Sequence, residues 1–231
     1  MSQVIDQLID ELLAQYKIIS KEPKRYIVGI TGIPGSGKST VSTQLTNRLN
    51  AKAQQEQLGE IAVLIPMDGY HKTRAELDVM EDPQNAHARR GSHWTFNPEL
   101  LVTLLHKLRN YHQYPDLYAP SFDHKAGDPV ENDIYISKHH FIIIVEGLYL
   151  NLEEPAPWNQ IPALLDESWF IPISIDASRK RTSQRHFQCG LTDTLEKGIE
   201  RYNNNDILNA EFVLNHMTKT AKVIDTNKDT M

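Results

Sequence analysis

Residues 32–39 read Gly32-Ile33-Pro34-Gly35-Ser36-Gly37-Lys38-Ser39 and match the phosphate-loop pattern G-x-x-x-x-G-K-[ST] at every fixed position. Glycines in such a loop let backbone N–H groups approach phosphate oxygens, and the helix that follows adds the positive end of its dipole. The pattern therefore predicts a nucleotide site. We expect its contacts to come from Gly32, Ile33, Pro34, Gly35, Ser36, Gly37, Lys38, Ser39 and Thr40.

The surroundings of this loop are those that the motif requires. Residues 25–31 form a β-branched run typical of a strand, and residues 38–53 have the apolar spacing of a helix. Further strands are predicted at 61–66, 141–145, 169–175 and 221–224, and further helices at 98–110, 177–188 and 192–202. This alternation predicts an α/β protein of the P-loop NTPase fold, with a parallel five-stranded sheet and helices on both faces.

Apolar residues recur at helical spacing near the N-terminus, from Val4 to Leu13, with acidic residues between them. We expect residues 1–24 to form a helix that packs on a single domain of residues 25–231. A helix that binds a membrane or a partner is the alternative. The segment has neither the basic start nor the long apolar core of a signal peptide.

The composition limits the function classes. The chain has 231 residues and a formal net charge of −6, so it lacks the basic footprint of a nucleic-acid-binding protein. No apolar run approaches the roughly 20 residues of a membrane span. Cys189 is the only cysteine, which excludes an intrachain disulfide and fits a cytoplasmic protein. Whether the chain is a monomer or a homo-oligomer stays open.

Carboxylates follow two of the predicted strands, at the edge where ligands bind in such sheets. Asp68 could accept a proton from an attacking hydroxyl, or it could be a turn residue before Gly69. Glu146 could belong to a Mg²⁺ shell, or it could bond to the turn at Gly147. In the loop, Lys38 can neutralise phosphate charge, and the Ser39 hydroxyl can ligate Mg²⁺.

The chain resembles the uridine kinase, phosphoribulokinase and pantothenate kinase family of P-loop kinases from about residue 26 to about residue 224. It is especially similar to the branch of bacterial sugar-kinase-like proteins and fungal ATP-dependent kinases. The landmarks beside the phosphate loop are Asp68-Gly69-Tyr70-His71, Arg90-Gly91 with Thr95-Phe96, Phe122-Asp123, Glu146-Gly147, Arg181 with Arg185, and Asn205-Asp206 with Asn209.

This resemblance implies a kinase that transfers the γ-phosphoryl group of Mg-ATP to a hydroxyl of a small molecule. It implies that Asp68 orients and deprotonates that hydroxyl, that Glu146 lies on the metal side, and that Lys38 takes part in catalysis. It also implies a small helical lid whose Arg181 and Arg185 reach the transferring phosphate. A solvated basic face is the alternative for the arginines. Asn205, Asp206 and Asn209 are then expected near the nucleotide, with helix capping or turn formation as alternatives.

The acceptor is expected to contact aromatic and polar residues in predicted loops. These residues are Tyr70, His71, Arg90, Trp94, Phe96, Phe122 and Asp123, and each could instead be structural. Two positions depart from the family: Asn97 stands where relatives usually carry aspartate, and Gly127 where uridine kinases carry a histidine. Uridine, another nucleoside, a sugar, a sugar acid and a pantothenate-like compound all stay open as acceptors.

Two other function classes compete with a kinase. A catalytically idle nucleotide-binding regulator predicts degraded catalytic positions, but Lys38, Asp68 and Glu146 are all intact. An ATPase that acts on protein or nucleic acid predicts a basic groove, which the acidic balance does not favour.

Overall fold

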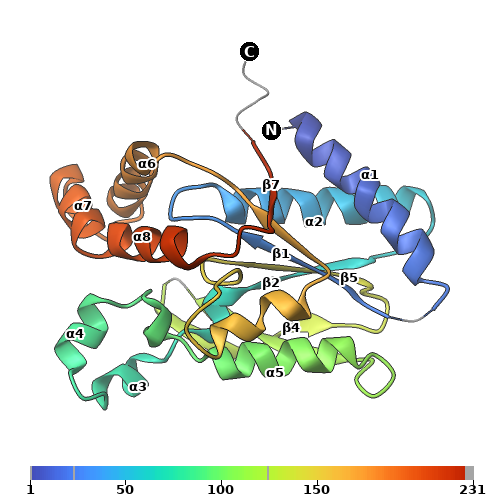
Figure 1. The fold of residues 1–231 in the computed structure, drawn as a ribbon, viewed down its shortest axis with the longest axis horizontal. Helices are drawn as coiled ribbons and strands as arrows, with labels where there is room; N and C mark the ends of the chain where they lie inside the picture. Colours follow the sequence, from blue (N-terminus) through green and yellow to red (C-terminus); the bar gives the residue numbers. More distant parts are fainter. Residues whose placement is uncertain (1, 23, 124, 227–231) are drawn as a thin grey trace.

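The computed structural model describes residues 2–22, 24–123 and 125–226. Its centre is a five-stranded sheet in which every neighbouring pair of strands is parallel (Figure 1). The strand order is β2 (Ala62–Pro66), β5 (Ile142–Gly147), β1 (Tyr26–Thr31), β6 (Glu167–Phe170) and β7 (Lys222–Val223). The predicted α/β class and the parallel five-stranded sheet are confirmed.

Strand β5 explains why the sheet is covered on both faces. Its four residues Ile142 to Val145 are all fully buried, and successive side chains point to opposite faces. Ile142 and Ile144 belong to the core beneath α1 (Ser2–Ile19) and α2 (Lys38–Gln55). Ile143 and Val145 belong to the core beneath α5 (Pro98–Arg109). One apolar run thus serves two hydrophobic cores.

Helix α1 packs on this framework through a buried stripe. Its buried residues are Ile5, Leu8, Ile9, Leu12, Leu13 and Ile19. Ion pairs join its polar side to α2, from Asp6 to Arg48 and from Asp10 to Lys52. No helix within residues 2–22, 24–123 and 125–226 is long and apolar enough to cross a membrane.

The C-terminal helices differ from their predicted bounds. Strand β6 ends at Phe170, earlier than predicted, and α6 (Ile175–Gln188) begins after Ser174, whose side chain caps it. Helix α7 (Leu195–Arg201) then continues through a π-helical turn (Tyr202–Asp206) into α8 (Ile207–His216). Asn205, Asp206 and Asn209 therefore lie inside a continuous helical segment. The alternatives of capping and turn formation were wrong for them.

An antiparallel hairpin of β3 (Leu117–Asp123) and β4 (Asp128–Ile136) was not predicted. Its apolar signal is weak, because only Leu117, Ala119 and Ile136 are buried and a bulge interrupts the pairing after Ala119. Short helices α3 (Arg74–Asp78) and α4 (Pro83–Ala88) also escaped prediction. The single-turn helices are Met67–Tyr70, His93–Thr95, Trp158–Gln160 and Pro162–Leu164.

The carboxyl ends of the strands face two groups of helices. Figure 1 shows α6, α7 and α8 on one side of this edge and α3 and α4 on the other. The phosphate loop joins β1 to α2 at the same edge.

Candidate active site

The phosphate loop has the backbone that its glycines permit. Gly35 and Gly37 have φ values of 74° and 89°, in the left-handed region that other residues rarely adopt. A Cβ on Gly35 would also come within 2.8 Å of Thr182 Oγ1 on α6. Helix α2 begins at Lys38, directly after the loop, so its positive end lies at the loop as the motif requires.

Sheet register brings a carboxylate to this loop. Glu146 pairs with Ile30 in β1 and with Pro66 in β2, so it lies at the carboxyl edge between the two strands. Its Oε1 is 3.9 Å from Lys38 Nζ, and it also accepts a hydrogen bond from Ser39. Burial raises the pKa of Glu146, against the opposing effect of Lys38, because a charged carboxylate loses water there.

These oxygen donors fit a hard divalent cation. The Ser39 hydroxyl and the Glu146 carboxylate lie together, and Mg²⁺ prefers such ligands. Among the described residues, no group of three or more His, Cys, Asp or Glu side chains could hold an ion alone. That sparse donor set suits Mg²⁺, which usually keeps water and substrate phosphates as its other ligands.

Asp68 lies in the single turn that follows β2. Its side chain is 48% exposed, so it can meet a ligand, and it is close enough to Glu146 to act on the pKa of that residue. The ring of His71 makes a 2.9 Å hydrogen bond to the Asp68 carbonyl, which fixes this turn. A Cβ on Gly69 would lie 2.3 Å from the Pro120 carbonyl, so only glycine fits between Asp68 and the hairpin.

Helix α6 lies against the phosphate loop. The Ser178 hydroxyl donates to the Pro34 carbonyl at 2.6 Å, and Arg181 Nη1 lies 3.5 Å from the Gly35 carbonyl oxygen. Arg185, one turn further on, is close enough to Glu146 to lower its pKa. Arg179 instead pairs with Asp176 of its own helix. Two of the three arginines are thus directed toward the loop and its carboxylate.

A second carboxylate, Asp206, is mostly buried and lies within range of two of the same cations. Burial raises the pKa of Asp206 to about 6, although Arg201, Arg185 and Lys38 act to lower it. His186 Nε2 is 3.7 Å from Asp206 Oδ2. Burial and neighbouring arginines lower the pKa of His186 to about 4, so this imidazole is neutral at physiological pH.

Some of the aromatic residues predicted to bind the acceptor are in contact with one another. The ring of His71 packs 3.9 Å from that of Phe96 and 4.9 Å from that of Phe122, centroid to centroid. Tyr70 is buried beside them, and its hydroxyl has no hydrogen-bond partner within the described part of the chain. Trp94 is half-buried in its single-turn helix.

The two polar anchors predicted for the acceptor are engaged within the protein. Arg90 pairs with Asp128 at 2.8 Å, donates to backbone carbonyls of Lys72 and Gly127, and lies over the Phe122 ring. Asp123 accepts from the backbone N–H groups that follow it in the hairpin turn. Phe122 and Asp123 end strand β3, so their predicted loop assignment was wrong.

Sequence reasoning missed two residues here. Tyr149 is fully buried, its ring lies 5.7 Å from that of Phe96, and its hydroxyl donates to the Gly91 carbonyl at 2.7 Å. Arg89 binds the two asparagines that the family resemblance placed near the nucleotide. The double arginine 89–90 was the only sequence signal for Arg89.

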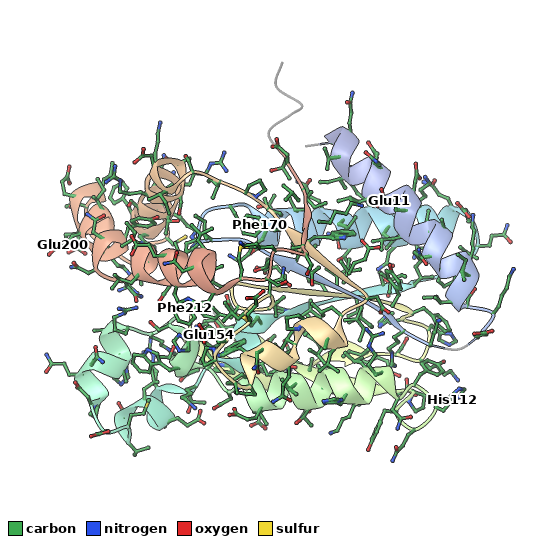
Figure 2. The ribbon with its side chains drawn as sticks, in the orientation of Figure 1. Glu11, His112, Glu154, Phe170, Glu200 and Phe212 are labelled. Atoms are coloured by element: carbon green, nitrogen blue, oxygen red, sulfur yellow. The ribbon has the colours of Figure 1, made fainter. Side chains whose placement is uncertain are left out.

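A stack of rings joins α8 to this side of the site. Phe212 packs 4.3 Å from His93 and 4.3 Å from His216, and His216 lies 3.6 Å from Glu154. Figure 2 shows Phe212 and Glu154 in the region between α8 and the helices of the opposite side.

A phosphate loop at the carboxyl edge of a parallel sheet, with a lysine, a hydroxyl and a carboxylate around it, defines the class of P-loop nucleotide-binding proteins. Residues 27–205 match the Phosphoribulokinase / Uridine kinase family. The chain therefore belongs to that family, as its motifs predicted. It is an ATP-binding P-loop kinase similar to uridine kinases.

Two curated relatives support this membership. C227.14 of Schizosaccharomyces pombe, described as a candidate uridine kinase, is 41% identical over 209 residues, which are 90% of this chain and 86% of that protein. The ATP-dependent kinase YFH7 of Saccharomyces cerevisiae is 31% identical over 226 residues. That match covers 84% of this chain and 64% of YFH7, just under two thirds of its length.

Solved structures agree on the fold. The crystal structure of YFH7 has a TM-score of 0.84 at 24% identity and covers 96% of this chain and 99% of that chain. A candidate fructose transport system kinase from Silicibacter sp. TM1040 has a TM-score of 0.78 at 26% identity, over 95% of this chain and 98% of that chain.

Proposed function

We propose that this kinase transfers the γ-phosphoryl group of Mg-ATP to a hydroxyl of a small molecule. The observation that carries the proposal is the convergence of Lys38, Ser39, Glu146 and Asp68 at one edge of three neighbouring strands. An aromatic group around His71 adjoins Asp68. A nucleotide site beside a small-ligand site is what such a transfer requires.

In this proposal each group of the chain has one task. Backbone N–H groups of the loop and Lys38 bind the phosphates, and Asp68 orients the acceptor hydroxyl and takes its proton. The hydroxyl oxygen then bonds to the γ-phosphorus while the bond to the β-bridging oxygen breaks, and ADP leaves. Bound Mg²⁺ would be held by Ser39 and Glu146, directly or through water, and would offset phosphate charge.

Arg181 and Arg185 would complete the site as a lid. Arginine suits this task because its planar group stays charged and binds two oxygens at once. The contact of Arg181 with the loop and the proximity of Arg185 to Glu146 support this role over that of a solvated basic face.

The acceptor is the open part of the proposal. Uridine is one candidate, given the name of the fission-yeast relative, and sugars, sugar acids and pantothenate-like compounds are others. At the position where relatives carry aspartate, Asn97 accepts from Lys72 Nζ at 2.7 Å and donates to Glu76 at 3.1 Å. This asparagine is therefore engaged with neighbouring side chains, which weakens the case for the usual nucleoside contact. We also propose a cytoplasmic location, which suits the exposed free thiol of Cys189.

An ATP-consumption screen tests the proposal. Mg-ATP would be combined with nucleosides, sugars, sugar acids and vitamin precursors, with Lys38→Ala as the inactive control. We expect one acceptor class to stimulate ADP formation well above the basal rate. A protein that binds ATP and yet phosphorylates no acceptor would instead be the idle nucleotide-binding regulator.

A further inference from the structure

Arg89 is held in place by neutral groups from distant parts of the chain. Its Nε donates to Asn205 Oδ1 at 3.0 Å, and its Nη2 donates to Asn209 Oδ1 at 3.1 Å and to Ser92 Oγ at 2.8 Å. Ser92 in turn donates to Asn209 at 2.9 Å, and Asn205 donates to the Arg90 carbonyl at 3.1 Å. These bonds fix the plane of the guanidinium and orient both amides.

Arg89 differs from its neighbour Arg90 in having no acidic partner among the described residues. Arg90 has a carboxylate partner in Asp128, whereas no carboxylate of the described residues forms an ion pair with Arg89. Its Nη1 also makes no hydrogen bond to those residues. Arg89 is half-buried, so a fixed positive charge remains uncompensated where water covers it only in part.

Such an arrangement is suited to an anion. Holding a guanidinium through neutral oxygens keeps it rigid and fully charged, and Nη1 still has two N–H groups to offer. Because the two N–H groups are already fixed, they lose little entropy when they bind a carboxylate or a phosphate. Hydrogen bonds between a guanidinium and such an anion are also stronger than hydrogen bonds between neutral groups.

The charge of Arg89 acts on the acceptor side of the site. The Tyr149 hydroxyl donates to the carbonyl of Gly91, two residues after Arg89. Burial raises the pKa of Tyr149 and lowers that of His93, and Arg89 is close enough to both rings to oppose the first shift and to add to the second. Tyr149 lies against Phe96, which packs on His71, and it also lies within electrostatic range of Asp68. The cations that act on Glu146 are instead Lys38 and Arg185, on the nucleotide side.

We propose that Arg89 binds an anionic group of the phosphoryl acceptor, so that the enzyme prefers acceptors that carry a carboxylate or a phosphate beside the reacting hydroxyl. This inference rests on the proposed kinase function and narrows its acceptor. Asn205 and Asn209 are then positioning residues, which hold Arg89 without neutralising it.

Matched pairs of acceptors test this inference. Each pair has one acidic and one neutral member: pantothenate and pantothenol, gluconate and glucose, glycerate and glycerol, ribose 5-phosphate and ribose. The first three pairs probe a carboxylate and the last a phosphate. In the parent enzyme we expect the acidic member of one pair to have the lower KM. Arg89→Gln should raise that KM about 10- to 100-fold, the usual effect of a charge-assisted hydrogen bond, and change the KM of the neutral member far less.

Asn209→Asp tests the same idea with the guanidinium retained. The new carboxylate would face Arg89 and pair with it, so anion preference should fall as in Arg89→Gln, while thermal stability should match or exceed that of the parent. This variant distinguishes an effect on anion binding from an effect on folding. If Arg89 had only a structural role, Asn209→Asp would leave the preference for acidic acceptors unchanged. Equal effects of both variants on acidic and neutral members would overturn the inference.

Calorimetry separates failure of this inference from failure of the kinase proposal. The acidic compounds would be titrated into protein saturated with Mg²⁺ and a non-hydrolysable ATP analogue, so that the phosphate loop is filled. Absence of binding by every acid overturns the anion site, even where a neutral acceptor is phosphorylated. Binding of an acid that Arg89→Gln abolishes, without phosphorylation of any acceptor, supports the anion site and overturns the kinase proposal.

Discussion

Lys38 Nζ and Glu146 Oε1 lie 3.9 Å apart, so the loop lysine has a carboxylate beside it. Both side chains are mostly buried, at 16% and 10% exposure. The contact keeps the positive charge of Lys38 and the negative charge of Glu146 together where water has little access. Phosphate would attract the lysine and Mg²⁺ would attract the carboxylate, so ligand binding offers each charge a new partner.

Lys38→Ala should abolish most activity without unfolding the protein. Lys38 starts α2 at the loop and is not part of either hydrophobic core, so its loss removes charge from the phosphate site alone. We expect kcat to fall about 10²-fold or more, by analogy with the loss of one preorganised donor. Lys52→Ala, on an exposed part of the same helix, is the matched control. Parent-like turnover by Lys38→Ala would refute the assignment of the loop.

Glu146→Gln should weaken the response to Mg²⁺. Glutamine keeps the shape but loses the charge that a divalent cation needs, so half-maximal activity should require about 10- to 100-fold more Mg²⁺. A titration of turnover with Mg²⁺ at saturating ATP measures this. Glu56→Gln, at an exposed site that pairs with Lys17, is the control. If the two variants have the same Mg²⁺ dependence, Glu146 is not on the metal side.

Arg181→Ala and Arg185→Ala should lower kcat more than they weaken ATP binding. Their proposed contacts strengthen as charge shifts in the transition state. A decrease of about 10-fold or more is expected for each, because each removes one charge from the transferring group. Arg179→Ala is a close control, since Arg179 lies on the same helix but pairs with Asp176. Equal activity of all three variants would leave α6 as a solvated basic face.

Asp68→Asn keeps the shape of the side chain and removes its ability to accept a proton. We expect kcat to fall roughly 10²–10³-fold, because general bases usually contribute about 10²–10⁴-fold and asparagine retains some positioning. Affinity for Mg-ATP, measured by calorimetry, should barely change because the loop is untouched. Asp78→Asn, at an exposed contact with His87, is the control. Loss of ATP binding in Asp68→Asn would show a metal or structural role instead.

Asp206 should make the folded protein less stable as pH rises from about 4 to about 6. Its pKa is 3.8 in an ordinary environment and about 6 in the fold, so within this window the folded state binds more protons than the unfolded state. Asp206→Asn removes this contribution to the pH dependence of the unfolding free energy. Relative to the parent, the variant should therefore gain on the order of 2–3 kcal/mol of unfolding free energy between pH 4 and pH 7.

Urea unfolding of both proteins at several pH values measures the effect. His186 contributes with the opposite sign, because its lowered pKa favours the folded state as pH rises from about 4 to 6.5. Because His186 lies 3.7 Å from Asp206, the difference between the two proteins reports Asp206 together with any change that its loss causes in His186. An unchanged difference in unfolding free energy across the range would mean that Asp206 is charged and well paired in the fold.

Local patterns were sufficient to predict the parallel sheet and the place of the phosphate loop between its first strand and the helix that follows. The phosphate loop is recognised from its own glycines, Lys38 and Ser39. A short run of β-branched residues such as Ile142–Ile144 favours a buried strand. Glu146 was singled out because it ends the most apolar strand, where a buried charge requires a partner, whereas its metal-side role came from the family resemblance and stays a prediction.

The acceptor side depended on contacts between distant segments. The hairpin has few fully buried side chains, so its sequence lacks a strong alternating pattern, and it becomes stable only by pairing and by packing near Asp68. The sequence predicted that Asp123 would bind a ligand. In the structure its carboxylate accepts hydrogen bonds from backbone N–H groups of the hairpin turn, which the sequence did not predict.

Arg89 and Arg90 differ in a way that the sequence could not predict. Adjacent arginines carry the same local signal, and nothing near them in the chain distinguishes the two. Arg90 is neutralised by Asp128, 38 residues away, whereas Arg89 meets Asn205 and Asn209, 116 and 120 residues away. Charge compensation depends on which oxygens lie within hydrogen-bond distance, and only the tertiary structure decides that.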